Sequence, residues 1–138
     1  MSDKQILIEK KAKSYLGIPY KYGVKPEDVP NFLDCSYFTM LVFEDIKKLG
    51  RSTILQATEG DEVLNEDYQK GDLLFLRGSK GHYNDDLFPG RNICIGHVVI
   101  YLDNGLVIHA SSPEGTVIQP LHEVIKNRGP VVIAKRMI

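Results

Sequence analysis

Hydrophobic positions recur at helical spacing in the first part of the chain. Residues 3–15 carry a loosely helical pattern, and residues 35–49 repeat apolar side chains at intervals of three or four until Gly50. The sequence therefore predicts a helix in each range. Asp34 or Ser36 is expected to cap the start of the second helix, because short polar side chains satisfy the first free N–H groups of a helix.

Short runs rich in β-branched residues replace the helical pattern in the second half of the chain. The tripeptide Asp-Asn-Gly (103–105) is a strong hairpin turn signal between two of these runs. Helices followed by strands are typical of an α+β fold, with N-terminal helices packed on an antiparallel β-sheet. The predicted strands cover residues 72–76, 97–101, 106–110, 116–119 and 131–137.

The connections between these elements differ in length. Residues 17–33, rich in glycine and proline, are expected to form a surface loop, and a short helix is expected near 52–58. Residues 77–94 form a long polar connection, and loops of that length in compact domains are usually functional or disordered. Its segment 81–86 contains His and Asp side chains of the kind that bind metals, but we favour a flexible lid or a plain surface loop.

Length and composition narrow the class of protein. The 138 residues fit one domain spanning 1–138, and 43% hydrophobic residues are ordinary for a globular chain. A net charge of −1 provides no electrostatic reason to expect a nucleic acid or a membrane as partner. No signal peptide and no stretch of ~20 apolar residues is visible. We therefore expect a cytoplasmic protein, unless lysis or a specialised secretion system releases it.

Cys35 is the main candidate for chemistry. It lies in the segment FLDCSYF (32–38), where the second predicted helix begins. A cysteine in the first turn of a helix is at the positive end of the helix dipole, which stabilises the nucleophilic thiolate. A cysteine nucleophile needs a base, and the base needs a polar orienting partner. Cys94 matches no zinc-binding spacing, and both cysteines are expected to be free thiols.

Two histidines are expected to meet at one end of the sheet. His97 opens one predicted strand, and His109 lies near the end of the next strand, across the hairpin turn. With Tyr101 roughly opposite Leu106, the two imidazoles fall near each other. One histidine then serves as the base and the other orients it, although a slip of one residue would turn a side chain to the other face.

Six motifs, in order, resemble the NlpC family of papain-like cysteine peptidases. They span nearly the whole chain, and Asp-Cys-Ser together with two histidines is far more specific than any single motif. The motifs are GIPYKYG (17–23), DCS (34–36), RSTILQ (51–56), GDLLFL (71–76), GHVVIY (96–101) and VIHASSPEGTV (107–117). The resemblance implies a papain-like α+β fold that hydrolyses peptidoglycan-derived peptides, typically at the bond after γ-D-glutamate.

Carried over by position, the resemblance also implies a role for individual residues. Cys35 corresponds to the nucleophile, His97 to the general base and His109 to the polar third residue. We expect no cofactor and no metal site. The pocket for the amino-terminal side of the substrate would be shaped by Tyr20, Asp34 and Ser36.

Some positions depart from the family pattern. Tyr22 stands where the family usually has Trp, Val24 where it has a second Gly, and Tyr37 where it commonly has Gly. These positions surround the expected pocket, so they concern the identity of the substrate more than catalysis. Arg51 and Gln56 match the pattern, and we expect them to tie the short helix to the core.

Two other functions stay open from the sequence. The same side chains support acyl transfer, or hydrolysis of another amide such as a protein side-chain amide, and the departures from the family pattern favour this alternative. The second alternative is a non-enzymatic binding module. In that module Cys35, His97 and His109 would bind zinc, for which thiolate and imidazole are common ligands.

Overall fold

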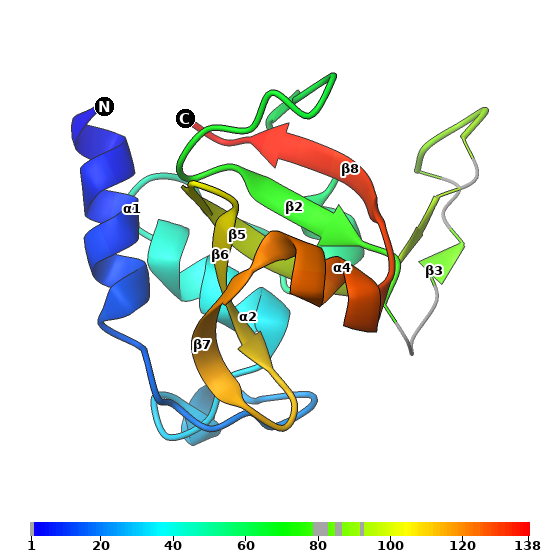
Figure 1. Ribbon diagram of the computed structural model, residues 1–138. Coiled ribbons are helices and arrows are strands. Elements are labelled where there is room, and N and C mark those ends of the chain that lie inside the picture. The colour runs from blue at the N-terminus through cyan, green and yellow to red at the C-terminus, as the bar shows by residue number, and fades with distance from the viewer. Residues whose placement is uncertain (1, 79–82, 85–86, 92) are drawn as a thin grey trace.

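A six-stranded antiparallel sheet runs through the centre of the structure (Figure 1). This computed structural model describes residues 2–78, 83–84, 87–91 and 93–138. The strand order is β1-β8-β2-β5-β6-β7, and β3 and β4 pair separately. The strands are β1 (Asp61–Glu62), β2 (Leu73–Leu76), β3 (Tyr83–Asn84), β4 (Cys94–Ile95), β5 (His97–Asp103), β6 (Leu106–Ser111), β7 (Gly115–Pro120) and β8 (Val131–Arg136).

Helices cover both faces of this sheet. α1 and α2 pack on one face, and α4 lies across the other (Figure 1). No helix in the described ranges is long and apolar enough to cross a membrane. The arrangement confirms the predicted α+β fold with N-terminal helices on an antiparallel sheet. The helices are α1 (Asp3–Lys13), the 3-10 helix η1 (Pro26–Asp28), α2 (Cys35–Phe43), α3 (Thr53–Gln56) and α4 (Leu121–Arg128).

Strand β2 contributes side chains to the hydrophobic clusters on both faces of the sheet. Its side chains point alternately to opposite faces, and all four are completely buried. Leu73 and Phe75 join the core under α1 and α2, whereas Leu74 and Leu76 pack with Val124 of α4. Full burial of such a side chain contributes about 1.5–3 kcal/mol, so both layers stabilise the central strands.

Two predicted helices are shorter in the structure. The helix predicted for 35–49 ends at Phe43, where the chain tightens and Ile46 N–H donates to the Phe43 carbonyl at 2.8 Å. Leu49 still reaches the core, but from the non-helical segment that follows α2. The helix expected near 52–58 is limited to the four residues of α3.

The hairpin between β5 and β6 differs by one residue from the predicted pairing. Tyr101 lies opposite Val107 instead of Leu106, and Leu106 pairs with Asp103. The register shifts between Tyr101 and Asp103, which places one extra residue on the β5 side. Because side chains alternate along a strand, this shift turns His97 and His109 to the same face, the one that α4 covers.

Helix α4 was absent from the predicted elements. Its start and end carry ordinary signals, since Pro120 precedes it and Gly129, with φ 87°, follows it. Leu121, Val124 and Ile125 have the spacing of one helix face, and they pack on the sheet. The helix therefore adds a second wall to the face that carries the histidines.

The long connection 77–94 contains the short strands β3 and β4, which the sequence did not predict. Residues 79–82, 85, 86 and 92 lie outside the described residues. Most of the segment considered as a lid or a metal site, 81–86, therefore also lies outside them.

The loop 17–33 is attached to the edge strand β7. Gly17 N–H donates to the Thr116 carbonyl at 3.0 Å, and Thr116 N–H donates to the Ile18 carbonyl at 2.9 Å. A Cβ atom at Gly115 would lie 2.9 Å from that Ile18 carbonyl oxygen, so the close approach requires glycine. The attachment holds Tyr20 beside the end of the sheet.

A buried carboxylate organises the start of α2. Asp34 accepts hydrogen bonds from the N–H groups of Tyr37 at 2.8 Å and Val24 at 3.1 Å, and from Arg51 Nη2 at 2.7 Å. Ser36 accepts from Arg51 Nη1 at 2.8 Å and donates to Asp34 at 3.3 Å. Asp34 is thus the helix cap, as predicted, and Arg51 has the structural role expected for it.

Gln56 provides the second predicted tie between α3 and the core. Its side chain is completely buried, and its amide donates to the carbonyls of Ser36 at 2.9 Å and Gly50 at 2.8 Å. Its amide oxygen accepts from the Thr39 hydroxyl at 2.6 Å. All of the polar atoms of this buried amide therefore have partners.

We expect Asp34→Ala to lower the free energy of unfolding by about 2–3 kcal/mol, because α2 loses its cap and buried donors lose their acceptor. Denaturant titration followed by circular dichroism measures this change. Asp45→Ala is the control, since it removes an exposed partner of Lys11 and should stay within about 0.5 kcal/mol of wild type. Equal stability of the two variants would contradict the role of Asp34.

Candidate active site

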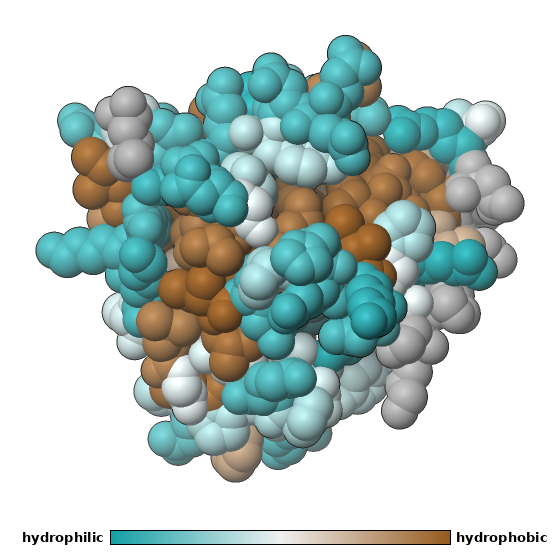
Figure 2. Space-filling model, in the orientation of Figure 1, coloured by the Kyte–Doolittle hydropathy of each residue, from teal (hydrophilic) through white to brown (hydrophobic). Residues whose placement is uncertain are grey.

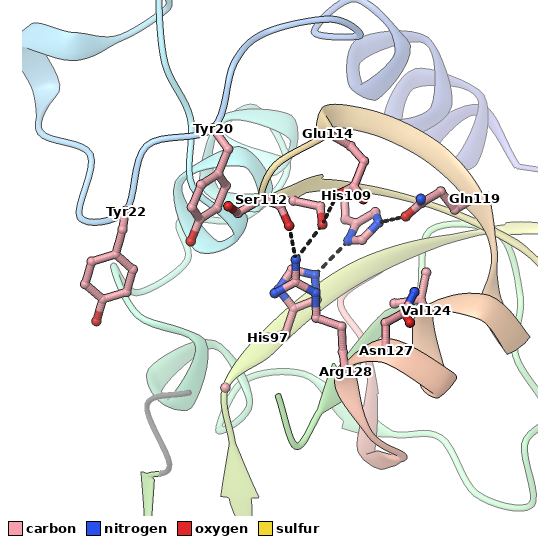
Figure 3. A pocket seen from close by; sticks show the side chains of 12 residues that line it. Tyr20, Tyr22, His97, His109, Ser112, Glu114, Gln119, Val124, Asn127 and Arg128 are labelled. Carbon is pink, nitrogen blue, oxygen red and sulfur yellow. Dashed lines mark hydrogen bonds between the residues drawn. The ribbon is translucent and has the colours of Figure 1, made fainter. Parts of the chain in front are cut away.

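A row of hydrogen-bonded side chains crosses the α4 face of β5, β6 and β7 (Figure 3). His97 Nε2 lies 2.7 Å from His109 Nδ1, and His109 Nε2 lies 2.7 Å from Gln119 Oε1. The two imidazole planes are inclined at 76°. The predicted proximity of His97 and His109 is therefore confirmed.

Gln119 determines which ring nitrogens carry protons. An amide oxygen only accepts hydrogen bonds, so His109 donates to it from Nε2. The Nδ1 atom of neutral His109 is then unprotonated and accepts the Nε2–H of His97. Neutral His97 keeps an unprotonated Nδ1, which is the nitrogen able to accept a proton from a nucleophile.

The histidines open into a cleft of about 820 Å³. Tyr20 and Tyr22 line it from the loop 17–33, and Arg128 lines it from the last turn of α4 (Figure 3). Figure 2 shows that the outer surface of α4 is hydrophilic, with hydrophobic residues on either side of it. The cleft therefore lies between a polar helix and an aromatic loop.

Cys35 begins α2 as predicted, but its thiol is less acidic than expected. Burial, and then the charge of Asp34, raises the pKa of the Cys35 thiol to about 11. The backbone N–H of Val98, the charge of Arg128 and the backbone N–H of Ser36 lower this pKa, but by less than burial raises it. The expectation of a lowered pKa is therefore wrong for the protein without substrate, because loss of solvation outweighs the neighbouring groups that favour the thiolate.

The thiol lies at the His97 end of β5. The backbone N–H of Val98, the residue next to His97, lies close enough to the sulfur to lower the pKa of the thiol. Within the described ranges no hydrogen bond joins the Cys35 thiol to the His97 ring. The Nε2 atom of that ring is hydrogen-bonded to His109. Catalytic hydrogen bonds are often long without substrate and tighten when it binds. The structure thus brings the two residues to one end of the sheet without a direct hydrogen bond.

Both histidines are neutral in this environment. Burial lowers the pKa of His97 well below its usual value, and the charges of His109 and Arg128 lower it further. Burial also lowers the pKa of His109, partly offset by the hydrogen bond to Gln119. The site at rest therefore pairs a neutral thiol with a neutral imidazole, the form in which His97 is able to accept a proton.

Tyr20 contributes a neutral phenol to the cleft. Burial, and then the charges of Cys35 and Asp34, raises the pKa of Tyr20 to about 12. The influence of Cys35 means that the phenol lies close enough to the sulfur for their charges to interact. Tyr20 therefore remains a hydrogen-bond donor near the thiol at neutral pH.

Two predicted pocket residues lie behind the cleft. Among the described residues, Tyr20 lines the cleft but Asp34 and Ser36 do not. Both are 6% exposed, and their side chains bind Arg51. Their contact with a substrate stays a prediction, whereas their structural contacts at the start of α2 are clear.

Sequence reasoning missed several polar residues of the cleft, Gln119 and Arg128 among them. Gln119 lies opposite Val107 in the β6–β7 pair, which places it on the same face as His109. Extending the predicted pairing by one more strand would have located it. Arg128 had no such signal, because helix α4 itself was not predicted.

The described part of the chain contains no group of three or more His, Cys, Asp or Glu side chains arranged to hold a metal ion. Cys35, His97 and His109, the zinc ligands of one alternative, do not converge on a common point. The two imidazoles bind each other through Nε2 and Nδ1 instead.

Comparison with known proteins supports a common origin with one family. The sequence pattern of the NlpC/P60 family matches residues 17–132. Protein P54 of Enterococcus faecium is 33% identical over 104 residues, which are 74% of this chain and 17% of P54. A Haemophilus influenzae protein named "Probable endopeptidase" is 33% identical over 114 residues, 80% of this chain and 62% of that protein. The chain thus spans less than two thirds of either relative.

Solved structures agree with this relationship. The NlpC/p60 domain of the peptidoglycan hydrolase SagA superposes with a TM-score of 0.73 at 28% identity, covering 96% of this chain and 98% of that domain. NlpC1 from Trichomonas vaginalis superposes with a TM-score of 0.76 at 22% identity, covering 98% of this chain and 44% of that protein. The second comparison bears on the fold alone, and together they confirm the papain-like fold.

Alkylation of Cys35 by iodoacetamide tests the neutral resting state. In a Cys94→Ser background, we expect the rate to rise continuously between about pH 6 and 9, because a thiol with a pKa of about 11 carries little thiolate at neutral pH. Mass spectrometry of the modified peptide measures the rate, and the urea-unfolded protein is the reference. A rate independent of pH from about 5 to 8 would instead indicate a thiolate–imidazolium pair.

Proposed function

This chain belongs to the NlpC/P60 family, and from that premise we propose that it is a cysteine hydrolase of peptidoglycan stem peptides. The cleaved bond is the amide that follows γ-D-glutamate. Cys35 is the nucleophile, His97 is the general base and His109 orients His97. The names of the SagA domain and of the Haemophilus relative, a peptidoglycan hydrolase and an endopeptidase, support this chemistry.

The row from His97 to Gln119 beside the thiol is the observation that carries the proposal. Nucleophilic catalysis needs a base within reach of the nucleophile and a polar group that holds the far nitrogen of that base. His109 holds Nε2 of His97, which leaves Nδ1 for the proton of Cys35.

The first step starts from the neutral pair. The sulfur of Cys35 forms a bond to the scissile carbonyl carbon, its proton passes to His97 Nδ1, and the carbonyl π electrons move to oxygen. His97 becomes an imidazolium that still donates to His109 through Nε2. Burial disfavours either charge alone, so the charges form together when the substrate is in place.

The intermediate then collapses to a thioester. The oxygen re-forms the carbonyl, the C–N bond breaks, and the leaving nitrogen takes the proton from His97. In the second half a water molecule gives a proton to His97 and attacks the thioester carbonyl. The C–S bond breaks and the sulfur recovers the proton, which returns Cys35 and His97 to their neutral forms.

The negative oxygen of the intermediate needs hydrogen-bond donors. The N–H of Cys35 is in the first turn of α2, where no carbonyl of the helix can accept from it. The phenol of Tyr20, kept protonated by its raised pKa, is a second donor near the sulfur. These two groups are the expected stabilisers of the oxyanion.

Mass spectrometry of L-Ala-γ-D-Glu-diaminopimelate after incubation with the protein tests the proposal. Wild type should release L-Ala-γ-D-Glu and free diaminopimelate, Cys35→Ala should release neither, and His97→Ala should lower kcat by roughly 100-fold or more. Cys94→Ala is the matched control and should keep the wild-type rate. Cleavage by Cys35→Ala would refute the assigned nucleophile, and an acyl group found on an acceptor other than water would identify a transferase.

Substitution of Gln119 tests the tautomer argument separately. Gln119→Leu should lower kcat/KM roughly 10- to 100-fold, by analogy with metal-bound histidines that lose the hydrogen-bond partner of their second ring nitrogen. Gln119→Glu still accepts from His109 and should keep most of the activity. Its carboxylate favours the imidazolium, so the acidic limb of the pH–rate profile should move to higher pH. Full activity of Gln119→Leu across the pH range would contradict the role of Gln119.

A further inference from the structure

A cation and an anion line the cleft without pairing with each other. Arg128 reaches the cleft from α4, and Glu114 reaches it from the turn between β6 and β7 (Figure 3). Within the described residues neither side chain forms an ion pair.

The hydroxyl of Ser111 forms a hydrogen bond with each of the two charged side chains. Its hydroxyl accepts from Arg128 Nη2 at 2.6 Å and donates to Glu114 Oε1 at 3.1 Å. Arg128 Nη2 also donates to the Ser112 carbonyl at 2.9 Å. Ser111 is 2% exposed, so a buried hydroxyl holds both charged groups in position. A guanidinium has five N–H donors, and those outside Nη2 are available to a ligand.

We propose that Arg128, Ser111 and Glu114 form a subsite for a zwitterionic amino-acid end of the substrate. The carboxylate of that end binds Arg128, and its ammonium group binds Glu114. This inference rests on the proposed function, and it specifies the residue that follows γ-D-glutamate. Diaminopimelate has a second amino-acid centre with both charges, whereas L-lysine has the ammonium group alone. The subsite therefore selects diaminopimelate.

Occupation of the subsite also affects the base. The positive charge of Arg128 is one reason for the lowered pKa of His97. A carboxylate bound to Arg128 cancels that charge locally and makes His97 a stronger base. Arg128 also lowers the pKa of the Cys35 thiol, so a carboxylate bound to Arg128 raises the pKa of the proton donor and of the acceptor together.

Calorimetric binding to the Cys35→Ala protein tests the subsite without turnover. We compare two peptides, L-Ala-γ-D-Glu-meso-diaminopimelate and L-Ala-γ-D-Glu-L-Lys. The first should bind at least roughly tenfold more tightly, because one charge-assisted hydrogen bond to Arg128 is worth that much. Adding Arg128→Met or Glu114→Gln should reduce the difference, and Arg128→Lys should restore part of it.

Lys126→Met is the matched control, since Lys126 is an exposed cation of the same helix outside the cleft. It should leave both affinities unchanged, and circular dichroism checks that each variant is folded. Equal binding of the two peptides by the Cys35→Ala protein would overturn the subsite. An equal loss of affinity for both peptides in Arg128→Met would also overturn the subsite, because Arg128 would then bind a group that both peptides share.

Turnover by the protein with Cys35 intact separates this inference from the proposed function. Cleavage of both peptides at equal kcat/KM would overturn the subsite and leave the hydrolase proposal intact. Selective binding of the diaminopimelate peptide without cleavage of either would support the subsite and refute the hydrolase proposal. Selective binding together with preferred cleavage of the diaminopimelate peptide supports both.

Discussion

The register of three antiparallel strands is the constraint on which the candidate site depends. β5, β6 and β7 each contribute one side chain to the row of His97, His109 and Gln119, and all three must point to the α4 face. A slip of one residue in either pairing would turn one member to the opposite face and break the row. The hydrophobic side chains on both faces of the sheet maintain that register, since a slip would also expose them.

Burial defines the electrostatic character of the site. Cys35 and His97 are both removed from solvent, and burial raises the pKa of the thiol and lowers that of the imidazole. Both shifts favour the neutral forms, so in the proposed mechanism the charge separation needed for attack is deferred until the substrate occupies the cleft. The nearby N–H groups of Val98 and Ser36 lower the pKa of the thiol by less than burial raises it.

A second part of the cleft is charged, because the side chains of Arg128 and Glu114 line it. These side chains come from α4 and from the β6–β7 turn, and the buried hydroxyl of Ser111 joins them. The neutral row and the charged side chains line the same cleft, so in the proposed function recognition of a charged substrate end and the basicity of His97 are electrostatically coupled.

The sequence by itself determined the elements and the main chemical groups. Apolar spacing and the Asp-Cys-Ser segment placed Cys35 at a helix start, and the Asp-Asn-Gly turn brought His97 and His109 onto neighbouring strands. Only the tertiary structure decided the rest. The extra residue in β5 sets the face of the histidines, and the solvent excluded around Cys35 raises its pKa. Arg128 and Gln119 join the site through packing and strand pairing between distant segments, which local patterns do not encode.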